Sequence, residues 1–192
     1  MSLSIIVPTC GRASLKRTLL SISPQLEDGD EVIVVGDGPQ PQAESICAEF
    51  GPCVEYLDGV ISHCYGNRQR QQGMTLATGD YLMFCDDDDV LVPNALTIVR
   101  KSASLWPGRP MLFQFIDRNG LVLWQRPIVT QGNISTAQIV FPNRPEYLGN
   151  WGDRYEGDLD FIQSTLAKWP GGESVLVWRP NILADCRKAV AA

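Results

Sequence analysis

The sequence predicts an α/β fold with a mainly parallel central sheet. Short apolar runs rich in β-branched residues alternate with segments whose apolar residues recur at helical spacing. Strands and helices in this alternation form a parallel sheet that helices cover on both faces. The chain has 192 residues, 44% of them hydrophobic and 20% charged, which is enough for one globular domain with a sizeable core.

The first half of the chain carries four predicted strands and four predicted helices. The strands are "LSIIVP", "DEVIVVG", residues 54–57 and "YLMFC". The helices are "RASLKRTLLSIS", "PQAESICAEFG" closed by Gly51, residues 67–77, and "VPNALTIVRKSASLW" with Pro93 in its first turn. No internal repeat or clear linker interrupts this order, so we expect a single domain over residues 1–192.

The second half begins with a predicted β-hairpin. In "MLFQFIDRNGLVLWQ" two alternating apolar runs flank Asn119-Gly120, a dipeptide that favours the tight turn of a hairpin. A strand at "AQIVF", a helix at "DLDFIQSTLAKW" and a last strand at "SVLVW" follow. This half therefore adds the hairpin and a final helix to the parallel sheet of the first half.

Composition excludes several classes of protein. The formal net charge of −6 leaves no broad basic face for a phosphate backbone, so nucleic acid is a disfavoured partner. The six cysteines form no CxxC pair or His-rich zinc spacing, and we interpret them as reduced thiols. No segment approaches the roughly 18 apolar residues of a membrane span, and "MSLSIIVPTC" lacks the basic region of a signal peptide. We expect a cytoplasmic protein with no transmembrane segment.

Four adjacent carboxylates, Asp86–Asp89, follow the apolar run Tyr81–Cys85 directly. Neighbouring charges of one sign repel, so this tract is either an acidic surface turn or a site where something compensates the charge. Divalent cations such as Mg²⁺ or Mn²⁺ take oxygen ligands of this kind. Ligands of parallel sheets bind at the carboxyl ends of the strands, where Pro8-Thr9 and Asp37 also fall, and this favours a site over a surface turn.

Two common nucleotide motifs are absent from the sequence. There is no GxxxxGK[ST] phosphate loop, and the first strand-to-helix turn, "PTCGRAS", contains only Gly11 where a dinucleotide fingerprint needs three glycines. ATPases and nicotinamide-dependent dehydrogenases are therefore disfavoured. A phosphate-bearing ligand would have to be held by a metal and by basic side chains.

Five blocks, taken in order, resemble the inverting family 2 glycosyltransferases, whose fold is of the GT-A type. These blocks are "SIIVPTCGR", "VIVVGDGP", "RQRQQGMTLATGDYLMFCDDDDVLVPNAL", "GNISTAQIVFPN" and "WGDRYEGDLDFI". The resemblance spans nearly the whole chain, and its third block is the most specific. It implies transfer of a sugar from a nucleotide-sugar donor, often UDP-linked, to an acceptor hydroxyl with a divalent metal, Mn²⁺ or Mg²⁺. Residues 1–105 would form the nucleotide-sugar half and residues 106–192 the acceptor half.

The resemblance also implies roles for residues in the nucleotide-sugar half. Pro8 and Thr9 match the end of the first strand, which lines the nucleotide. Asp37 matches an acid that recognises the base or the ribose, although aspartate before glycine is also ordinary turn chemistry. Arg70 matches an arginine that approaches the nucleotide, and its guanidinium geometry suits phosphate oxygens. An exposed helix arginine is the alternative interpretation.

The acid tract matches the Asp-x-Asp motif of the family. Asp86 and Asp88 bracket this motif, with Asp88 the direct metal ligand and Asp86 closer to the ribose while still a candidate for the metal. Asp87 is expected to take part in substrate binding. A bound cation there would neutralise the charge that the departing diphosphate gains.

The acceptor half supplies the expected catalytic base. Asp158 lies near the N-terminus of the predicted last helix, in "EGDLDFI", which resembles the Glu-Asp-x-Asp-Phe block that carries the base in the family. A helix cap without chemistry is the alternative, and the two roles are compatible. Trp151 is assigned an acceptor-side contact because aromatic faces stack on sugars and because it lies near Asp158 in sequence.

Several positions depart from the family pattern. Gly36 stands where a second acid is common, Gln71 stands where asparagine follows the arginine, and Gly157 stands where glutamate is common. A metal-binding histidine near the end of some relatives is absent, and the one histidine, His63, is interpreted as a loop or packing residue. These departures keep open a non-catalytic nucleotide-sugar-binding or scaffold protein.

A further alternative is a sugar-1-phosphate nucleotidyltransferase, which shares a similar fold. It is disfavoured because "PTCGRAS" lacks a glycine- and arginine-rich phosphate loop. The sequence leaves open the sugar, the oligomeric state, and whether the acceptor is a glycan, a lipid-linked molecule or a protein.

Overall fold

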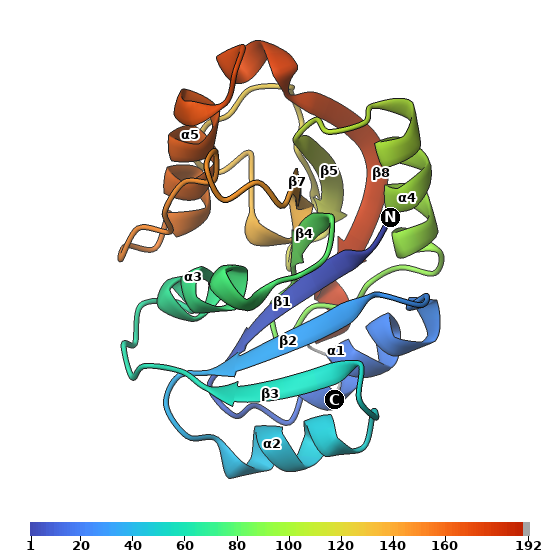
Figure 1. The fold of residues 1–192 in the computed structure, drawn as a ribbon, viewed down its shortest axis with the longest axis vertical. Coiled ribbons are helices and arrows are strands. Elements are labelled where there is room, and N and C mark those ends of the chain that lie inside the picture. Colours follow the sequence, from blue (N-terminus) through green and yellow to red (C-terminus); the bar gives the residue numbers. More distant parts are fainter. Residues whose placement is uncertain (190–192) are drawn as a thin grey trace.

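The computed structural model describes residues 1–189 and contains one eight-stranded mixed sheet (Figure 1). The strands follow the order β3 (Val54–Asp58), β2 (Glu31–Gly36), β1 (Leu3–Thr9), β4 (Tyr81–Phe84), β7 (Ile139–Pro142), β5 (Met111–Ile116) and β6 (Val122–Leu123), with β8 (Val177–Asp185) paired to β5. Strands β1 to β4 are mutually parallel, as the alternating pattern predicts, and β7 is antiparallel to both β4 and β5.

Helices cover both faces of the sheet. One face carries α1 (Leu15–Ile22), α2 (Pro41–Ala48) and α4 (Ala95–Leu105), and the other carries α3 (Asn67–Leu76) and α5 (Gly157–Lys168). Short 3₁₀ helices cover Ser23–Gln25, Thr136–Gln138, Gly172–Val175 and Cys186–Ala189. Because side chains alternate along a strand, Ile5 of β1 packs with the first group of helices and Ile6 with the second. Both residues are fully buried, so β1 lies at the centre of the core.

The predicted hairpin is confirmed. Strands β5 and β6 pair antiparallel, and the amide of Asp117 donates to the carbonyl of Leu121 at 2.9 Å. The Asp117 carboxylate accepts the amides of Asn119 (2.9 Å) and Leu121 (2.8 Å), and Gly120 supplies the positive φ of +85° that the turn needs. The turn is therefore held by its own side chain, although β6 is only two residues long.

Two predicted boundaries are wrong. Helix α4 begins at Ala95 rather than at Pro93, because Asn94 takes the left-handed conformation (φ +64°), which asparagine tolerates. The last strand begins at Val177 and continues to Asp185, beyond the predicted "SVLVW". Its register against β5 shifts between Leu112 and Gln114, and this irregularity accommodates Pro180 inside the strand.

Two predictions from composition can be compared with the structure. All six cysteines are free, as expected for reduced thiols. Within residues 1–189, no helix combines the length and apolar character needed to cross a membrane.

Candidate active site

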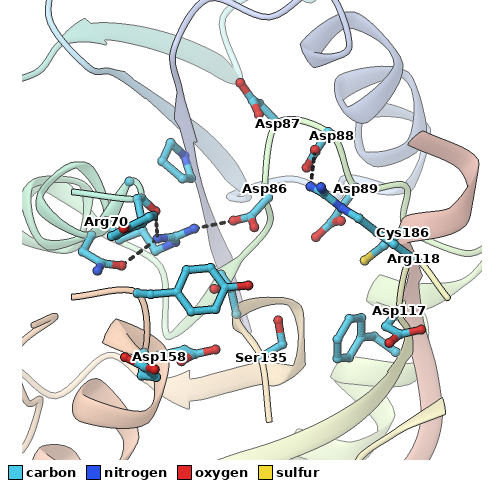
Figure 2. Close-up of a pocket in the computed structure, with 18 of the residues that line it drawn as sticks. Arg70, Asp86, Asp87, Asp88, Asp89, Asp117, Arg118, Ser135, Asp158 and Cys186 are labelled. Carbon is cyan, nitrogen blue, oxygen red and sulfur yellow. Dashed lines mark hydrogen bonds and ion pairs between the residues drawn. The ribbon is translucent and has the colours of Figure 1, made fainter. Parts of the chain in front are cut away.

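The predicted strand ends converge on one cavity of about 880 Å³ (Figure 2). It lies at the carboxyl ends of β1, β2 and β4, and residues from the β5–β6 hairpin and from the start of α5 complete its wall. The predicted site residues that line it are Pro8, Thr9, Asp37, Arg70, Asp86, Asp87, Asp88 and Asp158. The expectation that Asp37 and Asp88 share one sheet edge is therefore confirmed.

Asp87 is a buried member of the acid tract. Its side chain is only 5% exposed, and it accepts hydrogen bonds from the Thr9 hydroxyl (2.7 Å) and from Arg12 Nη1 (3.0 Å). Burial raises the pKa of the Asp87 carboxyl, while the Thr9 hydrogen bond acts in the opposite direction. Protein donors reach both oxygens, so Asp87 connects the acid loop to the end of β1 and to Arg12, and it also lines the cavity.

Asp88 is half-enclosed by two arginines from distant parts of the chain. Its Oδ2 accepts from Arg12 Nη1 (3.2 Å) and from Arg118 Nη2 (2.7 Å), and Oδ1 has no hydrogen-bond donor among residues 1–189. Arg12 follows β1 in the sequence, whereas Arg118 lies in the turn after β5, and Figure 2 shows its side chain reaching Asp88. The charge compensation that the tract requires is thus supplied in part by arginine side chains.

Arg70 compensates Asp86 from the buried side of the cavity. Its side chain is 4% exposed, and it donates to Asp86 Oδ1, to the Tyr65 carbonyl (2.9 Å) and to Asn67 Oδ1 (3.0 Å). Its guanidinium also lies 4.9 Å from the centre of the Trp151 ring. An arginine held by this many partners orients Asp86, and the alternative of an exposed helix arginine is wrong.

Trp151 lies in the core beneath Arg70. It is 6% exposed, stacks on Phe161 with ring centroids 4.8 Å apart, and packs edge-on against Phe84 at 5.0 Å. It is absent from the cavity wall formed by the described residues. The structure therefore corrects the expected acceptor-side contact, because the aromatic faces of Trp151 are already covered by protein.

Asp37 fastens the loop between β3 and α3. Its carboxylate accepts the amides of Ser62 (2.6 Å) and His63 (3.0 Å) and the side-chain amide of Gln69 (3.0 Å). His63 is a loop residue, as expected, and its exposed ring places Nδ1 3.3 Å from Asp37 at the cavity edge. Asp37 therefore shapes the cavity wall in addition to lining it.

Asp158 occupies the first turn of α5. Its Oδ1 accepts the amide of Leu159 at 2.7 Å, so the carboxylate does satisfy one of the free amides of the helix start. Burial raises the pKa of the Asp158 carboxyl to about 6, the Asp86 charge adds to that rise, and the Leu159 amide and Arg70 oppose it. A carboxyl with this pKa in a cavity wall can exchange a proton near neutral pH.

The departures from the family pattern have local packing reasons. A Cβ at position 36 would lie 2.5 Å from the Tyr56 hydroxyl, and a Cβ at position 157 would lie 2.3 Å from Asn67 Nδ2. That Asn67 amide donates to the carbonyls of Gly152 (2.7 Å) and Arg154 (2.8 Å), which fixes the loop before α5. Gln71 likewise accepts the backbone amide of Trp151 at 3.0 Å. Neighbouring side chains thus fill the space that larger residues would need at positions 36 and 157.

Much of the cavity wall was not identified from the sequence. Arg12, Arg118, Tyr65 and Tyr155 are among these residues. The two tyrosines are 61% and 75% exposed and meet edge to face with ring centroids 5.4 Å apart. Tyr65 and Tyr155 are 90 positions apart, and no sequence pattern relates them. Arg118 directly precedes the predicted Asn119-Gly120 turn, so the hairpin prediction did indicate its local position.

The donor set at the acid loop suits a hard divalent cation in part. Asp86 and Asp88 offer carboxylate oxygens to one cavity, and Asp88 Oδ1 is free of protein donors among the described residues. Residues 1–189 bring no three His, Cys, Asp or Glu side chains together as a complete metal site. A cation here would take its other ligands from water or from a phosphate-bearing ligand.

Solved structures of glycosyltransferases share this fold. TarS from S. aureus, residues 1–349, superposes with a TM-score of 0.75 and 17% identity over 96% of this chain and 60% of that structure. The mannosyltransferase PcManGT from Pyrobaculum calidifontis, solved with GDP-Man and Mn²⁺, superposes with a TM-score of 0.69 and 19% identity over 94% of this chain and 55% of that one. The expected GT-A-type fold is confirmed.

Two sequence comparisons point the same way. The GalNAc(5)-diNAcBac-PP-undecaprenol beta-1,3-glucosyltransferase of Campylobacter jejuni is 28% identical over 106 residues, which are 53% of this chain and 34% of that protein. The chain thus spans about a third of this curated relative and well under two thirds of the solved structures. The family model "Glycosyl transferase family 2" matches residues 4–104. Since this match covers more than half of the chain, the protein belongs to family 2 of the glycosyl transferases.

Proposed function

We propose that this protein transfers a sugar from a nucleotide-sugar donor, UDP-linked, to an acceptor hydroxyl, with inversion at the sugar and with a divalent cation. One observation carries the proposal: Asp86, Asp88 and Asp158 line a single cavity large enough for a nucleotide sugar. TarS has been solved with UDP-GlcNAc, and PcManGT with GDP-Man and Mn²⁺, which supports a nucleotide-sugar donor and a metal for this fold.

In this proposal the donor half comprises about residues 1–105. Pro8, Thr9 and Asp37 line the nucleotide side, at the ends of β1 and β2. Mn²⁺ or Mg²⁺ would be held by Asp88, with Asp86 beside it, and would neutralise the charge that grows on the leaving diphosphate. Arg70 orients Asp86 through its direct ion pair.

Asp158 is the proposed general base. Inversion requires the acceptor hydroxyl to lose its proton as it attacks the sugar from the face opposite the diphosphate. With a pKa of about 6, the Asp158 carboxyl is mostly ionised at pH 7 and still basic enough to accept that proton. Its position in the first turn of α5 directs it into the cavity from the acceptor half, about residues 106–192.

The acceptor side is assigned to Tyr65 and Tyr155 in place of Trp151. Both tyrosines line the cavity with exposed aromatic faces, which can stack on the apolar face of a sugar ring. Tyr155 and Asp158, the proposed base, lie three residues apart in the sequence and line the same cavity. The name of the Campylobacter relative describes a glycan linked to undecaprenol, which makes a lipid-linked saccharide the first acceptor class to test.

A nucleotide-sugar-binding protein without turnover remains the second candidate. The departures from the family pattern at Gly36, Gln71 and Gly157 favour this second candidate. However, Tyr56 fills the space beside Gly36, Asn67 fills the space beside Gly157, and Gln71 accepts a backbone amide. The test is nucleotide release from UDP- and GDP-sugars with Mn²⁺ or Mg²⁺, with and without saccharide and lipid-linked acceptors. Tight donor binding without turnover of any donor–acceptor pair would favour the second candidate.

A further inference from the structure

Among the described arginines that line the cavity, Arg118 has the most exposed side chain. Its Nη2 lies 2.7 Å from Asp88 Oδ2, and its side chain is 66% exposed although it lines the cavity. The backbone beneath it is fixed, because Asp117 accepts two amides of the same turn. The guanidinium is therefore a solvent-exposed charge on a fixed stretch of backbone, beside the carboxylate that is the proposed metal ligand.

A cation on Asp88 and a guanidinium on the same carboxylate compete. Asp88 has a single negative charge, and two cationic groups within about 4 Å of it would repel each other. A diphosphate bound next to the cation has pairs of oxygens that can accept hydrogen bonds from the displaced guanidinium. The planar geometry of arginine is well matched to such pairs.

We propose, on the basis of the function proposed above, that Arg118 is a donor-binding residue that exchanges partners. It pairs with Asp88 when no cation is bound, and it moves onto the donor diphosphate when a cation takes Asp88. The arginine thus couples metal binding to donor binding, and its charge helps to hold the leaving group.

The other two arginines of the cavity are poor candidates for this exchange. Arg70 is 4% exposed and has three different acceptors, so its guanidinium is not free to move. Arg12 also pairs with Asp87, whose buried carboxylate would lose its counterion if Arg12 left. Arg118 has Asp88 as its ion-pair partner within the described residues and loses only one surface contact by moving.

The test uses Arg118→Ala, with Arg126→Ala as the matched control. Arg126 is an exposed arginine of the same region and is not part of the cavity wall formed by the described residues. Mn²⁺ binding without nucleotide is measured from the electron paramagnetic resonance signal of free Mn²⁺. Binding of UDP and of GDP at saturating Mn²⁺ is measured by calorimetry.

The two affinities should move in opposite directions. Arg118→Ala removes one of the two arginines that contact Asp88, so Mn²⁺ alone should bind about threefold more tightly, the scale of an exposed ion pair. Nucleotide diphosphate should bind about tenfold more weakly, the scale of a lost hydrogen bond to a charged group. Arg118→Lys should retain part of the diphosphate affinity, because it keeps the charge without the planar fork. Arg126→Ala should change neither affinity.

Other outcomes would overturn the inference. If Arg118→Ala weakens Mn²⁺ and nucleotide binding together, Arg118 has a structural role only. If it leaves both affinities at the parent values while the parent binds UDP or GDP, the exchange is wrong and the proposed function stands. If the parent binds neither nucleotide with Mn²⁺, the proposed function and this inference fail together.

Discussion

Replacing Asp158 by asparagine should make this protein more stable and less active. The carboxyl is partly buried at the start of α5, and its pKa is raised from an ordinary value of 3.8 to about 6. The folded state therefore holds the Asp158 proton to higher pH than the unfolded state does. Stability is lost as pH rises from about 4 to 6, because ionising this partly enclosed carboxyl costs free energy only in the folded state.

The size of the effect follows from this pKa. At about 1.36 kcal/mol per pKa unit, the folded state pays up to about 3 kcal/mol at pH 7 to keep Asp158 ionised. Asparagine is neutral, has nearly the same shape and can still accept the Leu159 amide through its carbonyl oxygen. Asp158→Asn should raise the free energy of unfolding by up to about 3 kcal/mol at pH 7 and by almost nothing near pH 4.

Activity should change in the opposite sense. An amide cannot accept the proton of the acceptor hydroxyl, so the transfer rate should fall by about 10²-fold or more. The parent value of kcat/KM should decline below about pH 6, where Asp158 becomes protonated, unless another group titrates first. Affinity for UDP and Mn²⁺ should remain near the parent value.

Urea unfolding at pH 4 and pH 7, together with nucleotide release in the presence of an acceptor, checks both parts. A variant that transfers sugar at the parent rate would show that Asp158 only caps the helix. Asp153, Glu156 and Asp160 would then be the next candidates for the base. A variant that unfolds more easily than the parent at pH 7 would refute the burial argument.

Three further predictions concern the walls of the cavity. Asp88→Asn should weaken UDP binding at a fixed Mn²⁺ concentration by about tenfold or more, because an amide replaces a charged ligand; calorimetry with equal affinities would contradict this. Arg70→Met should lower the free energy of unfolding by about 2–3 kcal/mol. The Asp86 carboxylate, 38% exposed, loses its counterion, and the Trp151 ring loses its cation. An unchanged urea midpoint would show that these two Arg70 interactions do not stabilise the fold. Gly157→Glu introduces the common family residue and should lower the free energy of unfolding by about 1–3 kcal/mol, because its Cβ would lie 2.3 Å from Asn67. The double variant with Asn67→Gly should recover part of that free energy. No recovery would show that the clash involves another residue.

Much of the fold is readable from local sequence. The alternation of apolar strands with amphipathic helices is a local property, and it placed β1 to β4 with their helices in a parallel order. Because carboxyl ends of parallel strands lie at one edge, the same reasoning brought Thr9, Asp37 and Asp88 to one cavity. The path of β8 through Pro180 was missed because a bulge depends on the partner strand and not on the strand's own sequence.

What each side chain touches was decided by tertiary structure. The sequence determined that four adjacent carboxylates need compensation, but only the fold selects Arg12 and Arg118 as partners of Asp88 and Arg70 as partner of Asp86. Trp151 and Tyr155 both lie within seven residues of Asp158 along the chain, yet packing buries the first and exposes the second. Charge clusters and hydrophobic periodicity involve neighbouring residues, so they can be recognised in the sequence. Burial and ion pairing depend on segments that only the folded chain brings together.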